Sequence, residues 1–406
     1  MVGAANLESV SLDRDVRETI SEVLDQSYLR IQNWRGFFSQ TQSWAYEKKK
    51  RLQLTLLRGL AQEFDLKIET WDDFDTLPLS SKDEMRRFVP HNPETAIPHQ
   101  TSGSSGIPFA FYRDPALEAI DGAIFERAWS WVGRSDGLVL RLVSGNPKWK
   151  YYDSFRNIIP MNYRTIDDRY ADWMIEKKPR IIHGVAGAIR DLTDRVVRKG
   201  GARALENSIA YLMSEDSANH RKVLSRYYGG VFMGYGNAEC RTVASQCSAG
   251  TLHVNMETSI VESINGELYV SNLFNKVMPF LRYPTGDKGD VVARKSCACG
   301  LVSDAIEGIQ GKVIDYYYQP GMKRPTGWWL VSPISHEHAD LVKAWRLEII
   351  PSKKTIRVYV VPKSENLAGF QKYLGWVEEN TGFSTELVKA TELPDWRRKL
   401  MRVVDN

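Results

Sequence analysis

Residues 100–109 read Gln-Thr-Ser-Gly-Ser-Ser-Gly-Ile-Pro-Phe. Glycine lets a backbone approach a ligand closely, and successive backbone N–H groups can then face an anion. The Ser and Thr hydroxyls add hydrogen-bond donors without adding a fixed charge. This stretch predicts either a cradle for a polyphosphate or a flexible Gly/Ser linker, and only the remainder of the chain separates the two interpretations.

Two later stretches favour the cradle. Residues 234–239 read Gly-Tyr-Gly-Asn-Ala-Glu. Residues 283–287 read Tyr-Pro-Thr-Gly-Asp and follow a Gly-Glu-Leu-Tyr-Val stretch at 266–270. Each stretch alone is a weak indicator of function, but the three together, in this order, form a specific pattern.

The order and spacing of these stretches resemble those of the adenylate-forming superfamily, which includes acyl-CoA synthetases, luciferases and the adenylation domains of peptide synthetases. Three details are similar to its phenylacetate–CoA ligase-like branch. Residues 77–84 read Leu-Pro-Leu-Ser-Ser-Lys-Asp-Glu, Phe109 stands where the superfamily usually has lysine, and residues 297–300 read Cys-Ala-Cys-Gly. The resemblance covers residues 75–406, while residues 1–70 carry no matching motif.

The hydrophobic pattern predicts the fold class. Apolar residues recur with a helical period over residues 8–65 and again over 115–132. Between residues 138 and 233, short apolar strands alternate with helices. This alternation is typical of a parallel sheet that helices cover on both faces, so we expect an α/β fold.

The resemblance also implies a domain organisation. A large N-terminal domain over residues 1–310 would bind ATP and a carboxylate. Within it, short strands at residues 251–305 indicate a small β-rich subdomain. Residues 311–406 would form a small, mobile α+β domain.

Composition excludes several classes of protein. The chain of 406 residues is too long for one ordinary hydrophobic core, and its length predicts about two to three domains. A net charge of +4, from 54 basic and 50 acidic residues, is no footprint of nucleic-acid or membrane binding. Residues 1–15 are too polar for a signal peptide, and four cysteines do not indicate a disulfide scaffold. We therefore expect a cytoplasmic protein.

The resemblance implies an ATP site built from all three stretches. The loop would cradle the β- and γ-phosphates, and Tyr235 would lie against the adenine. Asp287 would accept hydrogen bonds from the ribose hydroxyls, and Glu239 would hold Mg²⁺. The alternatives are a core tyrosine, an ordinary turn and a surface glutamate. The predicted ATP-binding residues are Thr101, Ser102, Gly103, Ser104, Ser105, Gly106, Tyr235, Gly236, Asn237, Ala238, Asp287 and Lys312.

The C-terminal part departs from the superfamily in places. Residues 311–315 read Gly-Lys-Val-Ile-Asp instead of Gly-Arg-x-Asp-Asp. Lys312 keeps the charge of arginine but loses its bidentate fork, and Ile314 stands where the hinge aspartate is expected. Lys399 occupies the position of the lysine that bridges the carboxylate and the α-phosphate, although Arg398 replaces the usual glycine. Lys399 is thus the predicted catalytic residue together with Glu239, and the alternative is a solvated basic tail.

The acid substrate is expected at the sheet. Ligands of open parallel sheets bind at the carboxyl ends of the strands, and several residues fall just past predicted strand ends. The predicted acid pocket comprises Ser144, His183, Gly184, Met213 and Gly234.

A second group of residues predicts a metal site. Cys247 and His253 are followed, after a long gap, by Cys297 and Cys299. Three thiolates and one imidazole suit tetrahedral Zn²⁺, and four protein ligands make such a site structural rather than catalytic. Cys240 is an alternative ligand, and unrelated reduced cysteines are the alternative to a metal site.

These features predict an AMP-forming, ATP-dependent ligase that makes an acyl-adenylate, releases pyrophosphate and passes the acyl group to coenzyme A or to an amine. Its expected partners are a small carboxylic acid, aromatic by resemblance, the acceptor and a second copy of the chain in a homodimer. The alternative is a non-catalytic protein that binds a nucleotide or carboxylate and keeps the fold, as the departures at Lys312, Ile314 and Arg398 suggest. A nucleic-acid-binding zinc module fits the near-neutral charge poorly.

Overall fold

A computed structural model describes most of the chain. The described residues are 31–90, 93, 96–100, 109–133, 137–143, 158–213, 217–294, 296–311, 313–336, 338, 341–364, 366–394, 396 and 399–404. The chain divides into two compact units. The first unit comprises residues 1–99, 111–135 and 232–310, and the second comprises 100–110, 136–231 and 311–406. The domain boundary expected after residue 310 stays a prediction.

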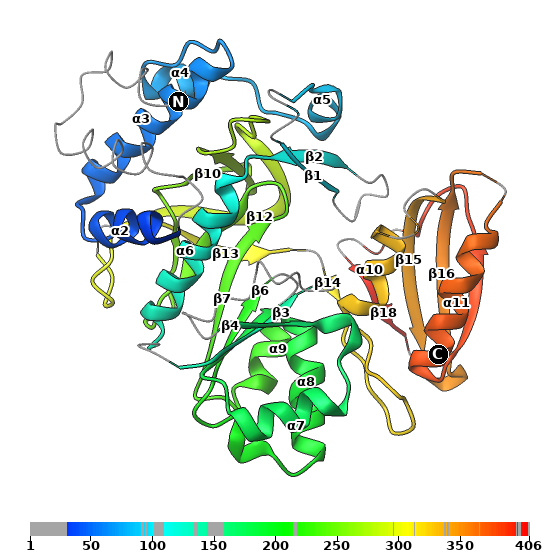
Figure 1. Cartoon of the computed structure of the whole chain (residues 1–406). Coiled ribbons are helices and arrows are strands. Elements are labelled where there is room, and N and C mark those ends of the chain that lie inside the picture. The colour runs from blue at the N-terminus through cyan, green and yellow to red at the C-terminus, as the bar shows by residue number, and fades with distance from the viewer. Residues whose placement is uncertain are drawn as a thin grey trace. The chain divides into compact units, whose positions relative to one another are not determined.

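Helices form one layer of the first unit. They are α2 (Ile31–Thr41), α3 (Tyr46–Glu63), α4 (Trp71–Thr76), α5 (Lys82–Arg87) and α6 (Ala116–Trp131). Figure 1 shows α2 beside α6, and the apolar faces of α2, α3 and α6 share one core with Ile260 and Phe274. The indole of Trp34 meets the Phe274 ring edge-on at 5.0 Å. The helical structure expected over residues 8–65 is present in its described part as two helices, α2 and α3, which a turn after Thr41 separates; residues 8–30 lie outside the described residues.

Antiparallel strands form the second layer of this unit. They are β7 (Gly230–Asn237), β8 (Arg241–Gln246), β9 (Leu252–Val254), β10 (Ser259–Ile264), β11 (Glu267–Asn272), β12 (Tyr283–Arg294) and β13 (Ser303–Gln310). Their order across the sheet is β10-β11-β12-β13-β9-β8-β7. A two-stranded ribbon of β1 (Ile97–Gln100) and β2 (Ala110–Arg113) flanks residues 101–108, which are not described.

Parallel strands are found in the second unit. They are β3 (Val139–Val143), β4 (Ile158–Asn162), β5 (Ile181–Val185) and β6 (Ile209–Met213), in the order β6-β5-β3-β4. The helices between and after them are α7 (Asp168–Lys177), α8 (Ala186–Arg198) and α9 (Ser217–Leu224), with short 3-10 turns at Tyr163–Thr165 and Ala202–Ala204. The predicted α/β class, with strands alternating with helices, is confirmed.

Two residues predicted to follow strand ends lie inside strands instead. Gly184 is within β5, and Gly234 is in the middle of β7 because that strand continues to Asn237. Met213 is the last residue of β6, as expected for a residue at a carboxyl end.

The C-terminal part of the second unit is a small α+β assembly. Its elements are β14 (Val313–Ile314), α10 (Trp328–His336), β15 (Val342–Ile350), a 3-10 turn at Pro351–Lys353, β16 (Thr355–Pro362), α11 (Ala368–Thr381), β17 (Ser384–Lys389) and β18 (Lys399–Val403). The strand order is β14-β18-β15-β16-β17. A solvated basic tail was the alternative prediction for the residues around Lys399. The structure instead has a strand there, β18, which pairs in parallel with β14 and β15.

Buried charges join the two layers of the first unit. Arg127 of α6 donates from its Nη1 to Glu257 at 2.8 Å, and Thr41 donates to the same carboxylate at 3.1 Å. Lys49 lies beside them and donates to the carbonyls of Gln42 and Val302 at 3.0 and 2.9 Å. Burial alone raises the pKa of Glu257, but the Arg127 and Lys49 charges outweigh it and lower the pKa to about 2.

Glu257→Gln should strongly destabilise the protein, because it leaves two buried cations without a counter-charge. We expect the free energy of unfolding in urea to fall by about 3–5 kcal/mol at neutral pH. Because the folded-state pKa of Glu257 is lowered from 4.5, its contribution is present above that pH and is lost as the pH falls towards 2. Glu69→Gln, which removes an exposed partner of Arg58, should change stability by less than about 1 kcal/mol. Equal effects of the two substitutions would contradict this account.

Candidate functional site

Two hydrogen bonds connect the Gly-Tyr-Gly-Asn-Ala-Glu stretch to the Tyr-Pro-Thr-Gly-Asp stretch. The Tyr235 hydroxyl donates to Asp287 at 3.1 Å, and the Tyr283 hydroxyl donates to Glu239 at 3.0 Å. Each stretch therefore supplies one tyrosine to a carboxylate of the other. Residues that are far apart in the sequence, and that were predicted to share one ATP site, come together in the first unit.

Burial and charge both act on these tyrosines. Burial, followed by the negative charge of Asp287, raises the pKa of Tyr235 well above its ordinary value. Burial and the Glu239 carboxylate likewise raise the pKa of Tyr283. Both hydroxyls keep their protons at neutral pH and act as donors that hold the two carboxylates in place.

The turn between β7 and β8 depends on a close backbone approach. A Cβ atom on Gly236 would lie 1.9 Å from the carbonyl oxygen of Arg241, so only glycine fits there. The register between β7 and β8 shifts between Tyr235 and Gly236, and this irregularity changes the direction of the backbone at this point. The Asn237 side chain accepts a hydrogen bond from the Cys240 N–H at 2.6 Å, and Arg241 adopts a left-handed conformation at φ 65°.

Arg113 supports the same turn from β2. Its guanidinium is buried and donates from Nε and Nη2 to the carbonyl oxygen of Ala238, at 3.0 and 2.5 Å. Burial, and then the nearby charge of Arg241, lowers its pKa to about 9, so it remains a cation at neutral pH. Arg113 therefore places a positive charge beside the peptide that precedes Glu239.

Sequence reasoning missed Arg113 and gave Tyr283 no role. A period-two pattern points to Arg113, because Phe109, Phe111 and Arg113 are buried while Ala110 between them is exposed. An arginine on the buried face of a strand requires a partner. No comparable sequence pattern distinguishes Tyr283 from an ordinary core tyrosine.

The residues predicted to bind the acid are distributed over both units. In the second unit, His183 of β5 is fully enclosed, and burial lowers its pKa well below the ordinary value, so its imidazole is neutral. A Cβ on Gly184 would lie 2.7 Å from Leu142 Cβ, so this glycine permits the close packing of β5 on β3. Gly234 lies in the first unit. A common acid pocket stays a prediction, and Ser144 lies outside the described residues.

Other predicted residues also lie outside the described part of the chain. They are the loop residues Thr101, Ser102, Gly103, Ser104, Ser105 and Gly106, together with Lys312 and Arg398.

Lys399, at the start of β18, makes an ion pair within the second unit. Its Nζ donates to both carboxylate oxygens of Asp315, at 2.9 and 2.8 Å. Asp315 also accepts a hydrogen bond from the backbone N–H of Val403 at 3.1 Å. In the described conformation the Lys399 ammonium is therefore bound by a carboxylate of its own chain.

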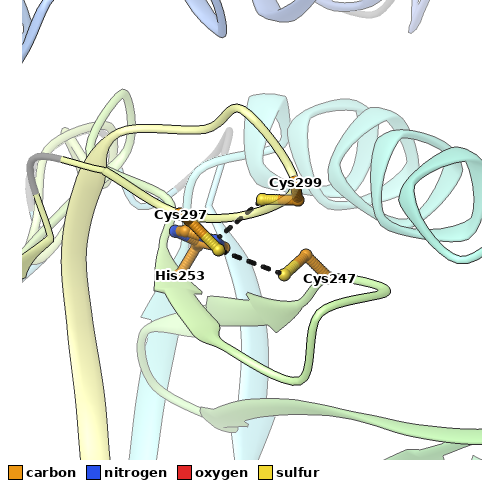
Figure 2. A group of neighbouring side chains, drawn as sticks. All are labelled: Cys247, His253, Cys297 and Cys299. Carbon is orange, nitrogen blue, oxygen red and sulfur yellow. Dashed lines mark hydrogen bonds between the residues drawn. The ribbon is translucent and has the colours of Figure 1, made fainter.

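The structure brings together the predicted cysteine and histidine ligands. Figure 2 shows the side chains of Cys247, His253, Cys297 and Cys299 converging; His253 is on β9, and the cysteines are on the two loops beside it. Their ligand atoms all lie within 4.8 Å of one another, with Cys247 Sγ 3.9 Å from Cys297 Sγ and Cys299 Sγ 3.4 Å from His253 Nε2. Cys240, the alternative ligand, is buried elsewhere and is not in this group.

The position of His253 is fixed from its other ring nitrogen. Nδ1 lies 2.8 Å from Ser303 Oγ, which leaves Nε2 facing the sulfur atoms. Such a partner on the second nitrogen orients a histidine ligand and sets its tautomer. The donor set, three sulfurs and one imidazole nitrogen, fits a tetrahedral Zn²⁺ ion.

Comparisons with known proteins identify the fold. No protein-family model matches the chain, and no curated protein sequence matches it. Solved structures of 2-hydroxyisobutyryl-CoA ligase do match. The structure in complex with 2-HIB-AMP and CoA in the thioesterification state has a TM-score of 0.57 at 15% identity, covering 92% of this chain and 90% of that chain. An open conformation of that ligase with the same ligands gives 0.52 at 15% identity, covering 93% and 92%.

The chain shares its fold with this acyl-CoA ligase. This confirms the resemblance to the superfamily at the level of architecture, whereas the phenylacetate–CoA ligase-like branch stays a prediction. The Tyr235 and Asp287 stretches lie in one compact unit of this chain, where two hydrogen bonds join them. None of the described helices is long and apolar enough to cross a lipid bilayer.

Gly236→Ala should disrupt the turn between β7 and β8, because the added Cβ cannot share space with the Arg241 carbonyl. We expect the free energy of unfolding to fall by about 1–3 kcal/mol, measured by thermal denaturation. Gly375→Ala is the matched control. Gly375 lies in α11 with nothing near its added Cβ, and the change should stabilise that helix by about 0.5–1 kcal/mol. A tolerated Gly236→Ala would show that the turn does not need this close approach.

Proposed function

We propose that this protein is an ATP-dependent carboxylate ligase that joins an acid to the α-phosphate of ATP, expels pyrophosphate and then transfers the acyl group to a thiol. The observation that carries the proposal is the pair of hydrogen bonds Tyr235–Asp287 and Tyr283–Glu239 on an adenylate-forming fold. These bonds place a flat aromatic ring and two oriented carboxylates beside one another. A nucleotide and its magnesium ion require groups of this kind.

Each residue has a separate task in this proposal. Tyr235 lies against the adenine, and Asp287 accepts hydrogen bonds from the ribose hydroxyls. Glu239 fits a magnesium ligand, because its carboxylate is buried and held by Tyr283, and magnesium commonly takes one or two carboxylates plus phosphate oxygens. The loop at residues 101–106 cradles the phosphates, and Lys312 adds positive charge.

Lys399 supplies the charge that the reaction needs most. Adenylation brings two anions together and builds negative charge on phosphorus, so catalysis consists mainly of positioning and electrostatic stabilisation. An ammonium that bridges the acid carboxylate and the α-phosphate serves both purposes. Because transfer of the acyl group does not need this bridge, Lys399 acts in the first half-reaction only.

Coenzyme A is the acceptor that we favour. The matching 2-hydroxyisobutyryl-CoA ligase was solved in complex with an acyl-adenylate and CoA, and this chain spans about nine-tenths of that protein. An amine acceptor is the alternative. For the acid we propose a small and, from the branch resemblance, aromatic carboxylate bound near Ser144, His183, Gly184, Met213 and Gly234.

We also propose that Cys247, His253, Cys297 and Cys299 bind one structural Zn²⁺. Support comes from their proximity and from the Ser303 partner of His253 (Figure 2). Cys247 follows β8, His253 is in β9, and the other two cysteines lie between β12 and β13. One ion would therefore cross-link two hairpins of the same sheet.

Lys399→Ala should abolish pyrophosphate release, by about 100-fold or more, when ATP, Mg²⁺ and the acid are supplied. Binding of ATP, measured by calorimetry, should be unchanged. Lys372→Ala, at an exposed position of α11, is the control and should retain full activity. A panel of aryl, acyl and amino acids, with hydroxylamine as a trap, identifies the acid class. Absence of pyrophosphate release across the panel, in protein that binds ATP, would favour the non-catalytic binding protein instead.

Protein purified without added zinc should contain about one Zn²⁺ per chain by elemental analysis. Cys247→Ala should lose most of that metal and unfold at a lower temperature. Cys240→Ala removes a cysteine outside the group and should keep the metal. A stable protein without metal would rule out the structural zinc site.

A further inference from the structure

Backbone contacts, as well as the ion pair, join β18 to Asp315. Asp315 follows β14 directly, and β14 pairs in parallel with β18, where Val313 lies opposite Lys399. The Asp315 backbone N–H donates to the Met401 carbonyl at 3.1 Å, and its carboxylate receives the Val403 N–H. These backbone contacts hold β18 against Asp315 without any help from the lysine side chain.

The lysine side chain therefore adds little to the sheet. It is 43% exposed, and its Asp315 partner is 21% exposed, so water can solvate the ammonium if the pair opens. A partly exposed ion pair contributes at most about 1 kcal/mol, and ordering a lysine costs side-chain entropy. Despite this, both carboxylate oxygens of Asp315 face the one ammonium group, at 2.9 and 2.8 Å.

The segment that carries Asp315 is anchored on its other side. Tyr316 donates to Asp194 of α8 at 2.5 Å, and Arg324 donates to Asp191 of the same helix at 2.8 Å. Arg324 also donates to the carbonyls of Tyr163 and Arg164. Contacts with β18 and with α8 thus hold the backbone around Asp315 in place, so its carboxylate offers a fixed partner to the flexible side chain of Lys399.

We propose that Asp315 is a positioning residue that stores the Lys399 ammonium between reaction steps and releases it to the anionic groups of the bound substrates. The inference rests on the proposed role of Lys399 in adenylation. A carboxylate and an α-phosphate present the same kind of oxygen atoms as Asp315, so they compete with it for one cation. Asp315 thereby holds the ammonium during the transfer of the acyl group, a step in which Lys399 takes no part.

Chemical labelling of lysines tests the storage directly and needs no substrate. In Asp315→Asn, trace acetylation with acetic anhydride, read by mass spectrometry, should modify Lys399 about two- to fivefold faster, the range that a partly exposed ion pair supports. Asp315→Glu keeps the charge and should label like the unaltered chain.

Asp172→Asn is the matched control. It releases Lys199 from a comparable pair of 2.6 Å in the same unit, so labelling should rise at Lys199 and stay constant at Lys399. If Lys399 labelling does not change in Asp315→Asn while Lys199 responds in Asp172→Asn, the storage role is overturned.

The two half-reactions provide the second test. Asp315→Asn should raise the single-turnover rate of pyrophosphate release by the same factor as the labelling, and leave acyl transfer from preformed adenylate to coenzyme A unchanged. A merely structural residue would slow both steps. Faster labelling with unchanged or slower adenylation would mean that Asp315 aims the lysine rather than withholds it, and would overturn the proposal. If the unaltered protein releases no pyrophosphate with any acid, the proposed function itself fails. Labelling would then still detect the Lys399–Asp315 ion pair, but the pair would have no role in catalysis.

Discussion

The approach of Gly236 to the Arg241 carbonyl is the constraint on which the candidate ATP site depends. It forces a tight turn between β7 and β8 that no residue with a side chain can make. Helix α6 holds the turn from outside, because Asp121 accepts hydrogen bonds from the Thr242 N–H and hydroxyl and pairs with Arg241 at 2.7 Å. With the turn fixed, Tyr235 and Glu239 can each meet a partner from β12.

The turn is held largely by charged groups, two of them buried and two half-buried. Arg113, Arg241, Glu118 and Asp121 alternate in sign around it. Charges in such surroundings interact more strongly than in water but tolerate no unpaired member. This arrangement gives a rigid backbone near Glu239, and rigidity is what electrostatic stabilisation of developing charge requires.

Part of the fold and of the candidate sites could be predicted from the sequence, and part could not. The alternation of strands and helices after residue 138 gave the correct α/β class, because a buried parallel strand leaves a short apolar run. The spacing of Cys247, His253, Cys297 and Cys299 correctly indicated one group, since few other residues of these types compete. Strand ends were less certain: β7 continues through Gly234 because the pairing with β8, a long-range interaction, decides where it stops.

The contacts between distant residues were beyond sequence reasoning. Nothing near Tyr283 reveals that its hydroxyl meets Glu239, and nothing near Lys399 reveals that Asp315 binds it. The turn between α2 and α3 depends on a contact of the same kind. Lys49, in the first turn of α3, donates back to the Gln42 carbonyl and so stabilises this turn.

The buried charges around Glu257 have a consequence for how much of the chain can be removed. A protein shortened to residues 75–406 would retain every stretch that resembles the superfamily. It would nevertheless lose Thr41 and Lys49, and it would uncover the apolar face of α6 that α2 and α3 shield. The carboxylate of Glu257 and the guanidinium of Arg127 would then be open to water on that side. The N-terminal helices, which carry no recognisable motif, are therefore an integral part of the first unit's core, and truncation guided by sequence resemblance alone would cut through it.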